Sequence, residues 1–238
     1  MLTTTQSLDG ALLVDKPAGM TSHDVVDRIR RHLGIKKVGH CGTLDPGATG
    51  LLIIVLGRGT KLSELLMASD KVYGGRIKFG EETSTYDGDG ELVASLPVPP
   101  MTLDDLNAAA NAFVGDTMQT PPMVSAVKVK GVPLYKMARK GIEVEREARL
   151  IHVYSFRFLS YAEPIGEFRL ACTKGTYVRT IAHDLGATIG CGAHLATLRR
   201  LDSGRFSVDD ARPLDELLAM SPRELEDRVI PFSKLAQA

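Results

Sequence analysis

Short runs of apolar residues recur along the chain and predict buried β-strands. Residues 11–15 read ALLVD and residues 51–56 read LLIIVL, and both runs are too short for a fully buried helix. Strands bounded by turn-forming residues are also predicted at 72–79, 124–131, 150–159 and 167–173.

Helical periodicity appears between these strands. Thr21 or Ser22 is expected to cap a helix that ends at Gly34 and whose apolar stripe includes Val25 and Ile29. Further helices are predicted at 61–68, 103–114 and 176–190, and as two short stretches near the C-terminus. Strands joined by both short turns and helical crossovers are typical of a mixed sheet, so we expect an α+β fold.

Length and composition favour a globular protein. The chain has 238 residues, of which 44% are hydrophobic, and the proline-rich LPVPP at 96–100 is too short to separate independent domains. We therefore expect a single catalytic domain over residues 1–238. No apolar run reaches the roughly 20 residues of a membrane span, and the polar start lacks the features of a secretory signal. These features predict a cytoplasmic protein.

The cysteines and the loop histidine do not indicate a metal site. Cys41, Cys172 and Cys191 are odd in number and lack C-x-x-C spacing, which favours separate reduced thiols. His40 is adjacent to Cys41, and nothing pairs with them at zinc-ligand spacing.

Charge is balanced overall but unevenly distributed. The 29 basic and 29 acidic residues cancel, which argues against a nucleic-acid binder on net charge alone. Two acid-free windows are nevertheless basic, and either could contact a polyanion or simply be a solvated surface. The windows contain Arg28, Arg30, Arg31, Lys36 and Lys37, and Lys128, Lys130, Lys136, Arg139 and Lys140.

One carboxylate stands in the glycine-rich segment GHCGTLDPGATG at 39–50. The spacing around Asp45 does not continue into Gly-Lys-Ser/Thr, so a Walker phosphate loop is not indicated. Asp45 could cap a turn, because Asp-Pro-Gly is ordinary turn chemistry. Alternatively, a carboxylate held close to a ligand by glycines could act as a nucleophile or general base, with Arg179 as a cation that keeps it ionised.

Five ordered segments over nearly the whole chain closely resemble the TruB family of tRNA pseudouridine-55 synthases. The resemblance implies the pseudouridine synthase catalytic fold, a mixed and largely antiparallel sheet flanked by helices and loops, with an inserted RNA-binding segment around 119–141. The segments are KPAGMTSHDVV (16–26), GHCGTLDPGATGLL (39–52), SDKVYGGRIKFG (69–80), QTPPMVSAVKVKGVPLYKMARKG (119–141) and TKGTYVRTIAHDLG with CGAHLATLRR (173–200).

The resemblance implies that the chain isomerises one uridine in the T-loop of tRNA. The aspartate of the family's G-x-L-D-P motif is catalytic and matches Asp45. Addition to the ring, attack on the ribose and a glycal route remain open. No cofactor or metal is required, because no redox change or phosphoryl transfer occurs.

Other family positions also carry over. Arg179 matches the arginine of G-T-Y-x-R, and Tyr73 matches a tyrosine that would stack on the target base and remove a proton. Substrate-binding roles are expected for His40, Tyr177, Leu198 and Lys16, with His40 stacking in the T-loop and Leu198 forming a wall of the uracil pocket.

The expected partner is the T-arm stem-loop of tRNA, from which the target nucleotide must be extruded. We expect a monomer with no membrane and no metal partner. Cys41 and Ser84 depart from the residues that the family often has there, and no full C-terminal PUA-type domain is expected. The alternatives are a tRNA-folding chaperone, with or without isomerase activity, and an aspartyl enzyme acting on a phosphate or sugar.

Overall fold

The chain forms two compact units, and the computed structural model describes residues 8–125, 127–129, 131–138, 140–142 and 144–236. The first unit comprises Met1–Ser69 and Arg199–Ala238, and the second comprises Asp70–Leu198. The single catalytic domain expected over residues 1–238 stays a prediction beside this division into two units.

Strand β3 (Thr49–Leu56) is central to the sheet of the first unit. Its residues 50–56 pair antiparallel with β1 (Gly10–Lys16), and residues 53–56 also pair antiparallel with β2 (Val38–Cys41). It pairs parallel with β12 (Ala193–Ser203) at Arg199 and Arg200. A strand with neighbours and covered faces on both sides accommodates an unbroken apolar sequence, which explains LLIIVL. The short strands are β13 (Phe206–Ser207), β14 (Arg212–Pro213) and β15 (Ile230–Pro231).

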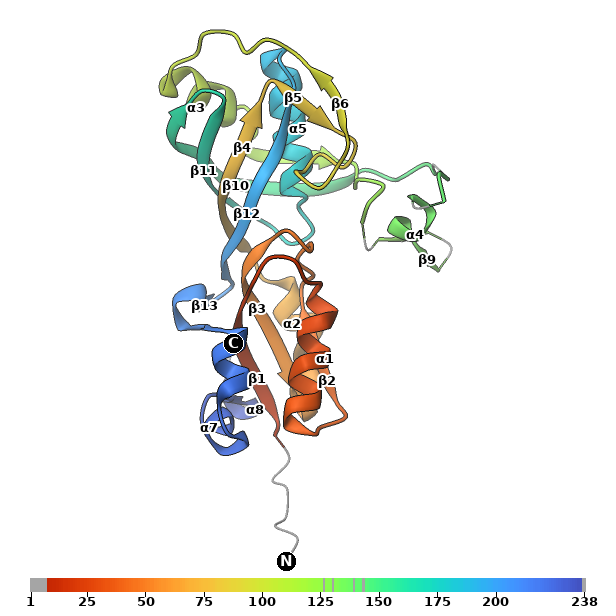
Figure 1. Cartoon of the computed structure of the whole chain (residues 1–238), viewed down its shortest axis with the longest axis vertical. Helices are drawn as coiled ribbons and strands as arrows, with labels where there is room; N and C mark the ends of the chain where they lie inside the picture. The colour runs from red at the N-terminus through yellow and green to blue at the C-terminus, as the bar shows by residue number, and fades with distance from the viewer. Residues whose placement is uncertain (1–7, 126, 130, 139, 143, 237–238) are drawn as a thin grey trace, which may run out of the picture. The chain divides into compact units, whose positions relative to one another are not determined.

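Helices cover both faces of this sheet (Figure 1). Side chains of β3 alternate: Leu52 and Ile54 pack with residues of α1 (Ser22–Leu33), whereas Leu51 and Ile53 pack with Leu66 of α2 (Ser63–Ala68). The remaining helices of this unit are the 3-10 helices η1 (Gly57–Leu62) and η2 (Val208–Asp210), and α6 (Leu214–Ala219), α7 (Pro222–Glu226) and α8 (Phe232–Leu235).

The second unit contains an antiparallel series of strands in the order β4, β11, β10, β7, with the first part of β12 beside β4. Their bounds are β4 (Lys71–Phe79), β11 (Ile165–Cys172), β10 (Arg149–Ala162) and β7 (Gly115–Gln119). Two further pairs are β5 (Glu81–Thr83) with β6 (Leu92–Ser95), and β8 (Lys128–Val129) with β9 (Val132–Pro133), which precedes α4 (Leu134–Ala138).

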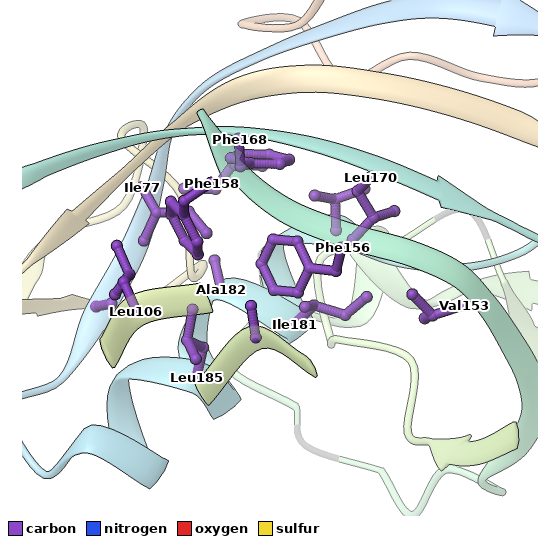
Figure 2. Packing of buried hydrophobic residues seen from close by; sticks show 14 of the residues in the cluster. Ile77, Leu106, Val153, Phe156, Phe158, Phe168, Leu170, Ile181, Ala182 and Leu185 are labelled. Carbon is purple, nitrogen blue, oxygen red and sulfur yellow. The ribbon is translucent and has the colours of Figure 1, made fainter. Parts of the chain in front are cut away.

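One face of this second sheet carries the core of the unit (Figure 2). Phe156, Phe158 and Phe168 pack against one another, with the Phe156 and Phe168 rings edge to face at 5.7 Å between centroids. Helices α3 (Leu103–Asn111) and α5 (Val178–Ile189) contribute Leu106 and Leu185 to the same cluster. The core therefore fixes the start of α5, where Arg179 lies.

The predicted α+β fold with a mixed, largely antiparallel sheet is confirmed, and several boundaries differ. The strand expected at 124–131 reduces to Lys128–Val129 among the described residues, with positions 126 and 130 outside them. The segment around Leu198, for which no strand is predicted from the sequence, is strand β12. The first residues of the glycine-rich segment belong to β2, α3 ends before 112–114, and three short helices rather than two close the chain.

Candidate active site

Asp45 lies in the first unit, on the loop between β2 and β3, and its side chain is partly exposed. Its carbonyl oxygen accepts a hydrogen bond of 3.0 Å from the Ala48 N–H, which closes the predicted Asp-Pro-Gly turn. On the preceding side, the Leu44 N–H donates to the Ser22 hydroxyl at 2.9 Å. The turn interpretation and the catalytic interpretation of Asp45 are thus compatible, because the turn involves its backbone.

Lys16 is buried beneath this loop. Its ammonium donates to the carbonyls of Pro17 at 2.9 Å, Pro46 at 3.2 Å and Ala48 at 2.7 Å, and the residue is 0% exposed. Three carbonyls match the three donors of an ammonium. Burial lowers the pKa of Lys16 from 10.5 to about 8, although the charge of Asp45 acts to raise it. The structure therefore gives Lys16 a role in holding the loop, and its contact with substrate stays a prediction.

Arg200 holds the other end of the loop. Only 1% exposed, it donates from Nε to the Leu51 carbonyl at 2.7 Å and from Nη2 to the Gly42 carbonyl at 3.1 Å. Gly42 has φ of +84°, and a Cβ there would lie 3.2 Å from Arg200 Nη1. Glycine thus permits both the left-handed backbone and the close approach of the guanidinium.

His40 lies on β2, half-buried and opposite Ile54. Burial lowers its pKa, and the positive charge of Arg200 adds to this effect. Among the described residues, no hydrogen-bond partner is found for its buried Nδ1. His40 is therefore neutral near pH 7, which suits a ring that stacks rather than one that pairs with phosphate; the stacking itself stays a prediction.

Tyr73 and Leu198 belong to the second unit. Tyr73 lies on β4 opposite Leu170 of β11, and both Tyr73 and Leu198 are partly buried against its core cluster. An aromatic ring and an aliphatic side chain thus project from the core face of one sheet. Their expected roles as stacking base and pocket wall are not tested by this geometry.

Arg179 is anchored within the second unit by an ion pair that the sequence did not indicate. Its Nη1 lies 3.0 Å from Asp87 Oδ2, with side-chain exposures of 5% and 17%, and Nη2 donates to the Val124 carbonyl at 2.6 Å. A buried guanidinium needs such partners, because an unpaired charge in the interior is costly. Asp87 in turn accepts a hydrogen bond from the Thr85 hydroxyl, so each member of the ion pair has a further hydrogen-bond partner. A pairing of Arg179 with Asp45 stays a prediction.

Tyr177 precedes α5 and is held through its backbone. The Gln119 side chain accepts from the Tyr177 N–H at 2.7 Å and donates to its carbonyl at 3.1 Å, while the Arg179 guanidinium lies 5.8 Å from the Tyr177 ring centroid. Gln119 ends β7, so it ties the beginning of the inserted segment to the N-terminus of α5. The substrate-binding role of Tyr177 stays a prediction.

The predicted site residues fall into two groups. Lys16, His40 and Asp45 lie in the first unit, and the second unit holds Tyr73, Tyr177, Arg179 and Leu198. The sequence predicts Ser22 only as a possible helix cap and indicates no site role for Ser22, Asp87 or Arg200. For Arg200 a signal was present, because in a strand one member of an adjacent Arg-Arg pair must point inward; here Arg199 binds Asp15 at 2.7 Å and Arg200 is buried.

Several other expectations can be compared with the described part of the chain. Cys41, Cys172 and Cys191 are all buried and form no disulfide, in agreement with the separate reduced thiols that the sequence predicts. Among the described residues, no cluster of histidine, cysteine, aspartate or glutamate could hold a metal ion, and no helix is long and apolar enough to cross a membrane. Of the basic residues expected to contact phosphate, Lys130 and Arg139 lie outside the described residues.

The sequence matches two family models that together cover most of the chain. Residues 30–178 match the N-terminal domain of the TruB family pseudouridylate synthases, and residues 179–235 match the tRNA pseudouridylate synthase B C-terminal domain. The tRNA pseudouridine synthase B of Opitutus terrae is 55% identical over 236 residues, covering 99% of this chain and 98% of that protein. The protein of the same name from Solibacter usitatus is 45% identical over 232 residues, covering 97% and 79%.

Solved structures agree with these matches. A Cbf5-Nop10-Gar1 complex contains a chain that superposes with a TM-score of 0.75 at 27% identity, covering 96% of this chain and 61% of that one. The archaeal box H/ACA sRNP Nop10-Cbf5 complex gives a TM-score of 0.72 at 26% identity, covering 97% and 62%. The present chain thus spans less than two thirds of those chains. From the family models, the whole-length relatives and the shared fold, the chain belongs to the TruB family of pseudouridylate synthases.

Proposed function

We propose that this chain converts a uridine in the T-loop of tRNA, position 55, to pseudouridine, with Asp45 as the catalytic carboxylate. The observation that carries the proposal is the buried support of the Asp45 loop in a chain of this family. Lys16, Ser22 and Arg200 are each at most 1% exposed, and each hydrogen-bonds a backbone group of residues 42–48. Such support is what a reacting group needs, because small displacements cost large factors in rate.

The proposed reaction is an isomerisation in which atoms balance without a cofactor. The bond between N1 of uracil and C1′ of ribose breaks, the base rotates, and a bond forms between C5 and C1′. C5 loses its hydrogen as a proton and N1 gains one. Depending on which of the three routes operates, Asp45 adds to C6, attacks C1′, or promotes loss of the C2′ proton, which returns when the new bond forms; Tyr73 is the proposed base for the C5 proton.

The Lys16 ammonium supplies one positive charge near Asp45, because the charge of Asp45 acts to raise the pKa of Lys16. We propose that Arg179, oriented by Asp87, supplies a second positive charge when substrate is bound.

Tritium release measures this reaction directly, because the new carbon–carbon bond replaces the C5 hydrogen. We expect wild-type protein to release tritium from a T-arm hairpin labelled at C5 of uridine, and Asp45→Asn to release at least about 1,000-fold less while still binding RNA. Asp210→Asn, at an exposed position of the first unit, is the matched control and should behave as wild type.

A second test of the proposed function is the position at which pseudouridine forms in the RNA. Carbodiimide mapping of the hairpin should find one pseudouridine at the T-loop position, and replacement of that uridine by cytidine should abolish tritium release. Product at other uridines, or full activity of Asp45→Asn, would contradict the proposal.

We also propose that the protein works as a cytoplasmic monomer on free tRNA. Sedimentation of the protein with one equivalent of T-arm RNA should then give a complex of one chain and one RNA. A dimer in this experiment would contradict the proposed monomer and leave the proposed reaction unaffected.

A further inference from the structure

Ser22 makes an unusual contact with the residue before Asp45. Its hydroxyl accepts a hydrogen bond from the Leu44 N–H at 2.9 Å and donates one to the Leu44 carbonyl at 3.2 Å. Both groups belong to one residue that is 22 positions away, and Ser22 is 1% exposed. A single buried hydroxyl therefore satisfies both backbone polar groups of Leu44.

These contacts bear on Asp45 through the geometry of the peptide bond. The Leu44 carbonyl belongs to the planar unit that includes the Asp45 nitrogen, so holding that oxygen fixes the orientation of the unit. On the other side, the Asp45 carbonyl accepts from Ala48 at 3.0 Å. Both peptide units that flank Asp45 are thus restrained, and its Cα has little freedom to move.

Helix formation does not account for a serine at this position. The N-cap of α1 is Thr21, whose hydroxyl accepts from the Asp24 N–H at 3.1 Å, and Asp24 completes a capping box. Ser22 is the first residue inside the helix and donates nothing to the cap. Its hydroxyl is therefore engaged with the Asp45 loop alone among the hydrogen bonds found for the described residues.

We propose that Ser22 is a positioning residue for catalysis, which holds the Leu44–Asp45 peptide unit so that the Asp45 carboxylate meets the reacting nucleotide. This inference rests on the proposed function of Asp45. It assigns to the start of α1 a part in the chemical step that is separate from RNA binding.

The test separates chemistry from binding. We expect Ser22→Ala to lower the single-turnover rate at saturating T-arm RNA by roughly 10- to 100-fold, because a displacement of about 1 Å has effects of this order. The Kd for the same RNA should stay within about threefold of wild type, because an interaction made mainly in the transition state affects the rate and not binding.

Two controls distinguish positioning from general destabilisation. Thr21→Ala removes the helix cap next door without touching Leu44, so it should lower the melting temperature while leaving the single-turnover rate near that of wild type. Ser22→Cys nearly preserves side-chain volume but replaces the hydroxyl by a weakly hydrogen-bonding thiol, so its rate should fall with that of Ser22→Ala.

Three results would overturn the inference: a wild-type rate in Ser22→Ala, an equal loss of rate in Thr21→Ala, or full activity in Ser22→Cys. Asp45→Asn measured in parallel keeps the two proposals apart. If Asp45→Asn is inactive and Ser22→Ala is normal, only the role of Ser22 fails, whereas an active Asp45→Asn removes the proposed function itself.

Discussion

Lys16, the buried lysine beneath the Asp45 loop, makes the stability of the protein depend on pH. Burial lowers its pKa from 10.5 to about 8. Between these values the unfolded chain keeps a proton on Lys16 that the folded chain has released. The free energy of unfolding contributed by this group therefore increases as pH rises through that window.

This linkage gives a prediction for Lys16→Met. We expect the stability of wild type relative to Lys16→Met to grow between about pH 7.5 and 10, by up to about 3 kcal/mol. Urea denaturation at both pH values measures the difference, and Lys36→Met, at an exposed lysine, should show little change. A relative stability that is constant or declines with pH would contradict this account of Lys16.

At the scale of elements, the geometry beside the Asp45 loop depends on where β3 meets β12. Gly50 pairs with Arg200 across the two strands and has φ of +97°, and a Cβ there would lie 2.3 Å from the Arg200 carbonyl oxygen. Gly19, in the turn after β1, also has positive φ, at +83°, but a Cβ added there would meet no atom within 4 Å. A side chain at Gly19 would therefore cause backbone strain alone, whereas a side chain at Gly50 would cause both backbone strain and steric overlap.

Alanine at these glycines should have unequal effects. Gly19→Ala should cost about 1 kcal/mol from backbone strain alone, whereas Gly50→Ala should cost about 3 kcal/mol or more because the strands must also move apart. Thermal unfolding of both variants measures this. Equal losses would mean that the β3–β12 contact adapts to the extra carbon.

Element-scale prediction succeeded where local pattern and packing agree. Helix α1 begins after Thr21 and ends at Gly34 as predicted, because the cap, the apolar stripe and the C-terminal glycine all act locally. Strand β12 has the sequence AHLATLRRLDS and was not predicted, because a charged residue such as Arg200 is not expected on the buried face of a strand. Its burial is possible because the guanidinium donates to the carbonyls of Leu51 and Gly42, which only the tertiary structure reveals.

At the scale of the whole molecule, the net charge is zero, but exposed basic residues lie together in the sequence just before β2. Arg30 is occupied by Asp27 and the Val38 carbonyl, whereas Lys36 and Lys37 are exposed and take part in none of the ion pairs found among the described residues. Of the first basic window, only Arg30 is thus engaged in an ion pair among those found, and Lys36 and Lys37 are exposed together with Arg28 and Arg31. Lys36 and Lys37 immediately precede β2, which leads into the Asp45 loop.

Salt dependence tests that surface. Replacing Lys36 and Lys37 together by glutamine should reduce the slope of log affinity against log salt by about 2, because each phosphate contact contributes about 1. Lys234→Gln, at an exposed lysine of α8, is the control and should leave the slope unchanged. An unchanged slope in the double variant would exclude this surface from RNA binding.

The sequence by itself determined the family, the α+β class, the main strands and helices, and Asp45 as the candidate carboxylate, since these depend on local pattern and motif. Tertiary structure alone decided what holds that carboxylate: Lys16, Ser22 and Arg200 reach the loop from 30, 22 and 158 positions away. It also decided that Arg179 binds Asp87. Lys16, Ser22 and Arg200 bind backbone carbonyl or N–H groups, which nearly every residue has, so the sequence does not show which residues they meet.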